Sequence, residues 1–165
     1  GRLWQMRNGY ALATKQGLER ISNRLNASSK TERDEFRKLL RIGIHWNVEV
    51  TLSGSGHKVS QAYCSALPVA YSDYPSSLWE NFPRLVLEAS YEATICATIL
   101  NSLETGSNRV FLTLLGGGAF GNKTDWVISS LDRALNLYKE WNIDVAIVSY
   151  GTSKDYVREL VSHFL

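Results

Sequence analysis

The sequence lacks most of the features that mark specialised classes of protein. Two cysteines in 165 residues are too few for the disulfide framework of a small secreted domain, and they point to the cytoplasm or another reducing compartment. No apolar run reaches the length of about 18 residues that a membrane-spanning helix needs, so we expect no membrane partner. A net charge of +2 gives no reason to expect a nucleic-acid partner. His45 and His57 have no partners at the spacing of a catalytic triad or a metal site, and we expect neither a metal nor a cofactor.

What is present is typical of one globular domain. Hydrophobic residues make up 44% of the chain and charged residues 21%, and no linker, repeat or low-complexity segment divides residues 1–165. The chain begins at Gly1 without a Met or a signal-peptide pattern. We therefore expect a single domain whose amino-terminal part lies upstream of this sequence.

Hydrophobic periodicity predicts an α/β fold. The predicted elements, in chain order, are helices over 10–25 and 30–40, strands over 48–52 and 58–69, a helix over 78–103, a strand over 110–115, a helix over 124–141, a strand over 144–150 and a helix over 153–164. Ser29 and Glu32 have the spacing of a capping box at the start of the second helix. Short apolar strands that alternate with helices are typical of a mostly parallel sheet covered on both faces. Ligands bind such sheets at the carboxyl ends of the strands, which here are followed by the loops after residues 69, 115 and 150.

The strongest local signal is a glycine loop between a predicted strand and a predicted helix. It consists of Gly116, Gly117, Gly118, Ala119, Phe120, Gly121 and Asn122. Glycines allow close approach of a ligand to the main chain, and free N–H groups at a helix start favour an anion, so a phosphate or diphosphate is the expected guest. The alternative is a tight strand–helix junction without a ligand. The spacing also matches a dinucleotide fingerprint, but the loop comes late in the chain and no acidic residue ends the next strand.

The loop and its surroundings resemble a known family. The run from Val110 to Asn122 is similar to the second ligand loop of macrodomains, and most similar to the poly(ADP-ribose) glycohydrolase-like branch, in which a strand leads into Gly-x-Gly-x-Phe-Gly-Asn. The segment from Ala62 to Pro68 is similar to that family's strand ending in a turn of small residues and proline. The resemblance covers residues 59–165. It implies a three-layer α-β-α sandwich with a mostly parallel mixed sheet, here without its amino-terminal strands.

The resemblance also implies a binding site for ADP-ribose or an ADP-ribosylated protein. The amides of residues 116–122 would hold the diphosphate, Phe120 would pack against the adjacent ribose, and Tyr150 would lie against the adenine. Asn8 and Gly9 match a remnant of the family's first ligand loop, although the sequence alone favours an ordinary Asn-Gly turn. Gln16 is followed by Gly17 rather than by the paired glutamates of the glycohydrolase branch, so the catalytic acid is not identified.

These observations predict a protein that binds ADP-ribose and removes ADP-ribosyl groups from modified protein. Breaking the bond at the anomeric carbon passes through an oxocarbenium-like transition state and needs a positioned water and a carboxylate. The missing glutamate pair leaves open a module that binds ADP-ribose without hydrolysing it. An enzyme that uses S-adenosylmethionine or NAD is a further alternative.

Overall fold

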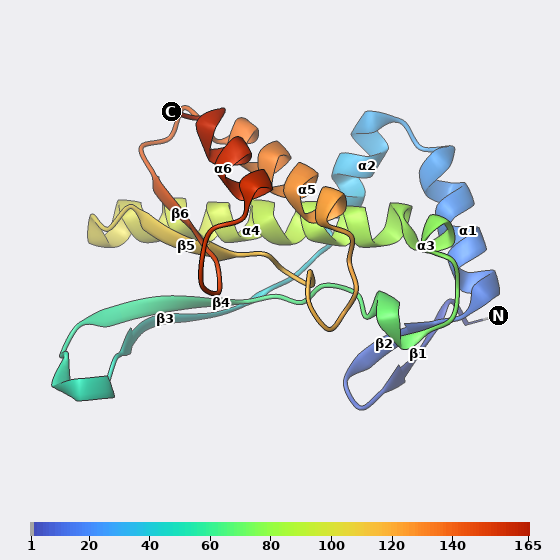
Figure 1. Ribbon diagram of the computed structural model, residues 1–165, viewed down its shortest axis with the longest axis horizontal. Helices are drawn as coiled ribbons and strands as arrows, with labels where there is room; N and C mark the ends of the chain where they lie inside the picture. Colours follow the sequence, from blue (N-terminus) through green and yellow to red (C-terminus); the bar gives the residue numbers. More distant parts are fainter. Residues whose placement is uncertain (1) are drawn as a thin grey trace.

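One long helix organises the protein (Figure 1). The computed structural model describes residues 2–165, which form a mixed α/β fold. The elements are β1 (Trp4–Arg7), β2 (Tyr10–Ala13), α1 (Lys15–Asn26), α2 (Lys30–Arg37), β3 (Gly43–Glu49), η1 (Leu52–Gly54), β4 (Lys58–Tyr63), η2 (Val69–Tyr71), α3 (Ser76–Trp79), α4 (Asn81–Thr105), β5 (Arg109–Thr113), α5 (Thr124–Leu137), β6 (Asp144–Val148) and α6 (Asp155–Ser162).

The central helix, α4, has sequence signals at both ends. Pro83 lies in its first turn, where a missing N–H leaves no hydrogen bond unmade. Gly106 ends the helix with a left-handed φ of 77°, and its N–H donates to the Ser102 carbonyl at 2.9 Å. Leu87 and Ile95 are completely buried along the helix. The predicted helix over residues 78–103 and its glycine stop are therefore confirmed, with a short helix, α3, preceding it.

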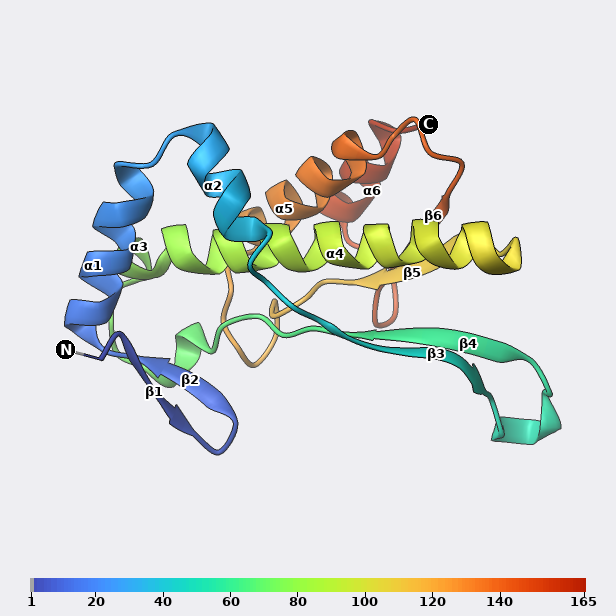
Figure 2. The ribbon, with the colours of Figure 1, turned by 180° about the vertical axis from the view of Figure 1, so that it is seen from behind.

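Helices and strands occupy opposite sides of α4. Helices α1, α2 and α5 pack on one side, and β3, β4 and β5 run along the other (Figures 1 and 2). Trp79, Trp126 and Leu131 are at most 1% exposed in the core that α4 shares with these helices. Burying a large apolar side chain contributes about 1.5–3 kcal/mol, so this core supplies the main driving force for folding.

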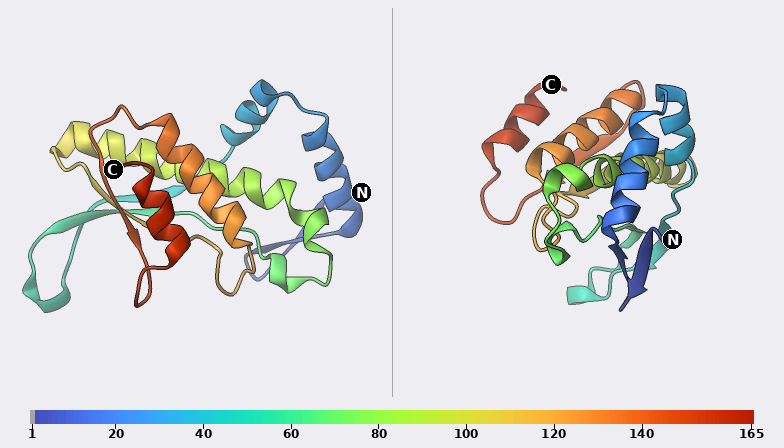
Figure 3. Two further views of the ribbon diagram at one scale, coloured as in Figure 1. Left: turned by 45° about the horizontal axis from the view of Figure 1, so that its top comes forward. Right: turned by 90° about the vertical axis from the view of Figure 1, so that its right-hand side faces the viewer.

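Within residues 2–165 the strands form three separate pairs, and only one of these is parallel, so the prediction of a mostly parallel sheet was wrong for this part of the chain. β1–β2 and β3–β4 are antiparallel hairpins, and β5–β6 is a parallel pair in which Thr113 lies opposite Val148. Both hairpins project from the helical body (Figure 3). The carboxyl ends of β5 and β6 lie side by side, so the loops that follow Thr113 and Val148 begin next to each other.

The prediction of a helix over residues 10–25 was wrong at its start. Asn8 and Gly9 have φ values of 50° and 81° and form the two-residue turn of the β1–β2 hairpin, because Asn-Gly accommodates positive φ at both positions. The helix begins only after Thr14, whose side chain accepts from the Gly17 N–H at 3.0 Å.

Several other predicted elements have different bounds in the structure. The strand predicted over 48–52 was wrong in most of its length, because β3 covers Gly43–Glu49 and Leu52 already lies in η1. The strand predicted over 58–69 ends at Tyr63, and the helix predicted over 124–141 ends at Leu137. Beyond Tyr63 the chain turns toward the glycine loop, where the Ala70 N–H donates to the Phe120 carbonyl at 3.0 Å. The capping box is confirmed: the Glu32 N–H donates to Ser29 Oγ at 3.2 Å, and the Ser29 N–H donates to the Glu32 carboxylate at 2.9 Å.

Candidate functional site

The glycine loop leaves β5 and leads into α5, as the sequence predicts. Two of its glycines are required by their surroundings. Gly116 has a φ of 73°, and a Cβ there would lie 2.2 Å from the Ala66 Cβ. Gly121 has a φ of 68°, and a Cβ there would lie 2.8 Å from the Ala70 Cβ. Because both glycines touch the segment that follows β4, they fix the loop against it.

Asn122 closes the base of the loop. It is 4% exposed, and its Nδ2 donates to the Leu67 carbonyl at 2.9 Å and to the Gly116 carbonyl at 3.3 Å. Its main-chain N–H also donates to the Gly116 carbonyl, at 3.0 Å. The first and last residues of the loop are therefore tied together, and the loop has a fixed shape before any ligand arrives.

The crest of the loop presents main-chain donors to solvent. Gly117 and Gly121 use their N–H groups inside the loop, donating to the Leu114 and Gly118 carbonyls. Within residues 2–165, the N–H groups of Gly118, Ala119 and Phe120 make no hydrogen bond to the protein. Gly118 and Ala119 are exposed, and α5 starts only a few residues later. Three consecutive free donors near a helix start form an arrangement that suits an anion.

Phe120 joins an aromatic cluster that the sequence did not reveal. We use this name for Tyr10, Tyr71 and Phe120, whose ring centroids lie 5.3–5.9 Å apart in edge-to-face contacts. Desolvation and the neighbouring Tyr10 raise the pKa of the Tyr71 hydroxyl. The cluster brings the β1–β2 hairpin to the glycine loop, which lies more than a hundred positions further along the chain.

The remaining predicted site residues lie in different surroundings. Tyr150 follows β6 and is fully exposed, at the same end of the β5–β6 pair as the glycine loop. Asn8 and Gly9 are exposed at the tip of the hairpin whose next residue, Tyr10, contacts Phe120. The turn explanation for Asn8 and Gly9 is thus confirmed, and a ribose contact for either stays a prediction.

Two cavities flank the glycine loop, and neither is lined by residues 116–122. The larger, of about 740 Å³, reaches Leu115 just before the loop. The smaller, of about 280 Å³, is lined by Tyr71 of the aromatic cluster and by Asp73, its one carboxylate. The crest residues Gly118 and Ala119 are therefore exposed outside both cavities.

Two buried oxygens near this end of the sheet lack hydrogen-bond partners. They are Oδ1 of Asn122 and Oγ of Ser149, the residue that follows β6. Most buried polar atoms in proteins are paired, so two unpaired atoms beside the carboxyl ends of β5 and β6 are unusual. Sequence reasoning had placed Asn122 in the loop but gave no sign that its amide would be buried.

A metal-ligand cluster, a membrane-spanning helix and a disulfide are all absent from the residues that the structure describes. Within residues 2–165 no three His, Cys, Asp or Glu side chains gather closely enough to hold a metal ion. No helix in that part of the chain is both long enough and apolar enough to cross a bilayer. Cys64 and Cys96 are free and partly buried, and burial raises the pKa of the Cys64 thiol.

Comparisons with models of protein families, with curated proteins and with solved structures found no match for this chain.

Proposed function

We propose that the glycine loop binds the diphosphate of ADP-ribose, within a domain of the macrodomain type. The observation that carries the proposal is the row of free N–H groups at Gly118, Ala119 and Phe120, on a loop held rigid by Asn122. Two phosphoryl groups accept several hydrogen bonds at once, and donors already in place cost no reordering on binding. The start of α5 adds a favourable field for the negative charge.

Aromatic side chains on both sides of the loop suit the rest of the ligand. Phe120, supported by Tyr10 and Tyr71, offers an apolar surface for a ribose. Tyr150 is fully exposed beyond β6, where its ring is free to stack on an adenine. A ligand with a base at one end, a diphosphate in the middle and a second ribose fits this order of groups better than a mononucleotide does.

The experiment compares two substitutions at Ala119 by calorimetric titration with ADP-ribose. Ala119→Pro removes the main-chain N–H of residue 119 from the crest. Ala119→Ser keeps this N–H and also makes the side chain slightly larger, so it serves as the control. Loss of one hydrogen bond to a charged group costs about 1.5–3 kcal/mol, so Ala119→Pro should bind at least about tenfold more weakly than Ala119→Ser. Equal urea unfolding midpoints would show that both variants fold alike. Absence of binding by the folded wild-type chain at millimolar ADP-ribose contradicts the proposal.

Hydrolysis of a protein-linked ADP-ribosyl group is a second candidate, supported by Asp73. This carboxylate lines the smaller cavity together with Tyr71, whose ring contacts Phe120. Water would add to the anomeric carbon as the bond to the modified side chain breaks, with the carboxylate accepting the proton from water and the leaving atom gaining a proton. Release of free ADP-ribose from modified protein by the wild type but not by Asp73→Asn, with ADP-ribose binding unchanged, would separate hydrolysis from binding alone.

A further inference from the structure

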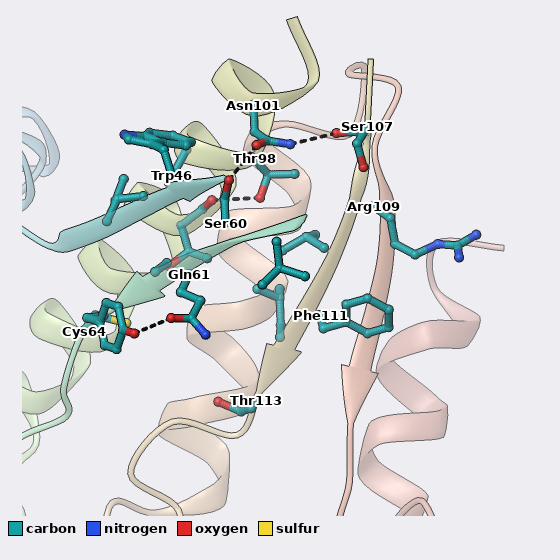
Figure 4. Close-up of a pocket in the computed structure, with 18 of the residues that line it drawn as sticks. Trp46, Ser60, Gln61, Cys64, Thr98, Asn101, Ser107, Arg109, Phe111 and Thr113 are labelled. Atoms are coloured by element: carbon teal, nitrogen blue, oxygen red, sulfur yellow. Dashed lines mark hydrogen bonds between the residues drawn. The ribbon is translucent and has the colours of Figure 1, made fainter. Parts of the chain in front are cut away.

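Two unpaired strand edges face each other across an open slot (Figure 4). Among the strands of residues 2–165, β4 pairs only with β3, and β5 pairs only with β6. The cavity of about 740 Å³ lies between them, bounded by Lys58–Cys64 on one side and Arg109–Thr113 on the other. Helix α4 forms its floor. We call this space the strand slot.

The main chain of β5 directs hydrogen-bonding groups into the strand slot. The Asp144 N–H donates to the Asn108 carbonyl at 2.9 Å. This bond determines which residues of β5 hydrogen-bond to β6 in the parallel pair. In such a pair, alternate residues turn their N–H and C=O groups to the same side. Val110 and Leu112 therefore bond toward β6, and Arg109 and Phe111 turn their main-chain groups toward the slot. Unpaired edge groups of this kind are a template for another strand.

The size of the strand slot matches one strand. A strand rises about 3.3 Å per residue, lies about 4.8 Å from its neighbours and sits in a layer about 10 Å thick, so five residues occupy about 800 Å³. The cavity of about 740 Å³ is of the same order, so it has room for a short strand, and β5 itself has five residues. β4 and β5 run in the same general direction (Figures 1 and 4), so a strand between them can run parallel to both.

Hydrogen bonds frame the strand slot at both ends. At one end Asn101 of α4 accepts from Ser60 Oγ of β4 at 2.9 Å and donates to the Ser107 carbonyl before β5 at 3.2 Å. At the other end the Tyr91 hydroxyl donates to the Thr113 carbonyl and accepts from the Leu115 N–H, both at 2.8 Å. Asn101 therefore links β4 to the chain before β5 at one end of the slot, and Tyr91 ties the other end of β5 to α4.

The lining of the strand slot specifies the side chains of its occupant. The floor carries small residues, among them Thr94, Ala97 and Thr98, which leave room for small side chains above α4. The outer rim carries the exposed rings of Tyr63 and Phe111, which suit β-branched side chains. Lys58 and Arg109 are the only charged residues of the lining, and no carboxylate is among them.

The two cations of the lining mark one end of the slot. Lys58 begins β4 and Arg109 begins β5, so both lie where a parallel occupant would begin. Arg109 already pairs with Asp144 at 2.8 Å, whereas Lys58 makes no ion pair within residues 2–165. An acidic residue at the amino end of the occupant would complement this charge.

We propose that the strand slot binds an extended segment of a second polypeptide, about five residues long and parallel to β4 and β5. Small side chains of this segment face α4, β-branched side chains face the rim, and an acidic residue at its amino end lies beside Lys58. The proposal does not depend on ADP-ribose binding, because the glycine loop lies outside the slot.

The test uses the synthetic peptide acetyl-Asp-Val-Ala-Val-Ser-Val-amide, labelled with a fluorophore, and the whole chain. We expect saturable binding by fluorescence anisotropy and slower hydrogen exchange at the Phe111 amide when the peptide is present. The matched variants are Phe111→Pro, which removes the N–H facing the slot, and Phe111→Val, which keeps it. Because this N–H does not bond to β6, both variants should fold, and Phe111→Pro should bind about fivefold more weakly than Phe111→Val.

Charge reversal gives the second readout. The wild type should bind the Asp peptide more tightly than the same peptide with Lys in the first position, and Lys58→Glu should reverse that order. Failure of the wild type to bind the Asp peptide, equal binding by the two Phe111 variants, or the same peptide preference in Lys58→Glu overturns the proposal. A dimer of the chain that the peptide does not dissociate also overturns it, since the slot would then hold a second copy.

Discussion

Replacing Gly116 with alanine tests whether close packing around this residue holds the glycine loop in place. The residue has a left-handed φ of 73°, which costs an L-amino acid about 1–2 kcal/mol. Its new Cβ would lie 2.2 Å from the Ala66 Cβ and 2.7 Å from the Asn122 Nδ2, so the loop or the segment after β4 must move. Forcing an extra carbon into a well-packed site costs about 1–3 kcal/mol. We therefore expect Gly116→Ala to lower the free energy of unfolding by about 2–5 kcal/mol.

A neighbouring glycine provides the matched control. Gly118 lies on the crest, its φ is outside the left-handed region, and no atom lies within 4 Å of the position of an added Cβ. Gly118→Ala should therefore change the free energy of unfolding by no more than about 0.5 kcal/mol. Glycine-to-alanine changes two residues apart should thus differ clearly in their effect on the free energy of unfolding.

Urea unfolding followed by tryptophan fluorescence measures both variants. Trp126, in the first turn of α5, is 1% exposed and is one of the five tryptophans that contribute to this signal. If Gly116→Ala does not fold, the double variant Gly116→Ala with Ala66→Gly removes the closest contact and should recover part of the loss. Equal stability of Gly116→Ala and Gly118→Ala would refute the close packing described above.

Four further substitutions test other parts of the fold. Asn122→Ala should lower stability by about 1–3 kcal/mol in urea unfolding, because it leaves the part-buried Leu67 carbonyl without this donor, and an unchanged midpoint would contradict this role. Tyr91→Phe should lower the free energy of unfolding by a similar amount, about 1–3 kcal/mol. It should also speed hydrogen exchange at the Leu115 amide, because in the wild type this N–H donates to the Tyr91 hydroxyl. Ser29→Ala should cost about 1 kcal/mol through loss of the cap. The hydrogen bond from the Ser29 N–H holds the pKa of Glu32 below its ordinary value of 4.5, so stability from this carboxylate is present above pH 4.5 and is lost as the pH falls through the lowered pKa. Wild type and Glu32→Gln should accordingly differ in stability at pH 7 and converge in acid, and a constant difference would count against the capping box.

Local signals in the sequence predicted the features that depend on neighbouring residues. The capping box at Ser29 and the stop at Gly106 are both fixed by hydrogen bonds within one turn, so their residue types reveal them. The glycine loop was found for the same reason, since its glycines mark positive φ and close main-chain contacts. These features need no knowledge of the rest of the chain.

Features that join distant segments were missed. The contact of Tyr10 with Phe120 depends on how the β1–β2 hairpin packs, and periodicity even placed Tyr10 in a helix. The amide of Asn122 is buried because Leu67 lies above it, a pairing across 55 positions that no local pattern records. The strand slot also escaped prediction, because an unpaired edge is visible only once the order of the strands is known.

The glycine loop and the strand slot share their supports, although we propose a different partner for each. The segment after β4 holds the loop through the Asn122–Leu67 and Ala70–Phe120 hydrogen bonds, which tie the chain beyond β4 to the chain beyond β5. Tyr91 fixes Thr113 and Leu115, which lie at the end of the slot and at the entrance to the loop. Loosening the loop through Asn122→Ala should therefore weaken the peptide in the slot as well, whereas Ala119→Pro, which acts only on the crest, should leave peptide binding unchanged. Equal peptide affinity of Asn122→Ala and the wild type would mean that α4 alone sets the width of the slot.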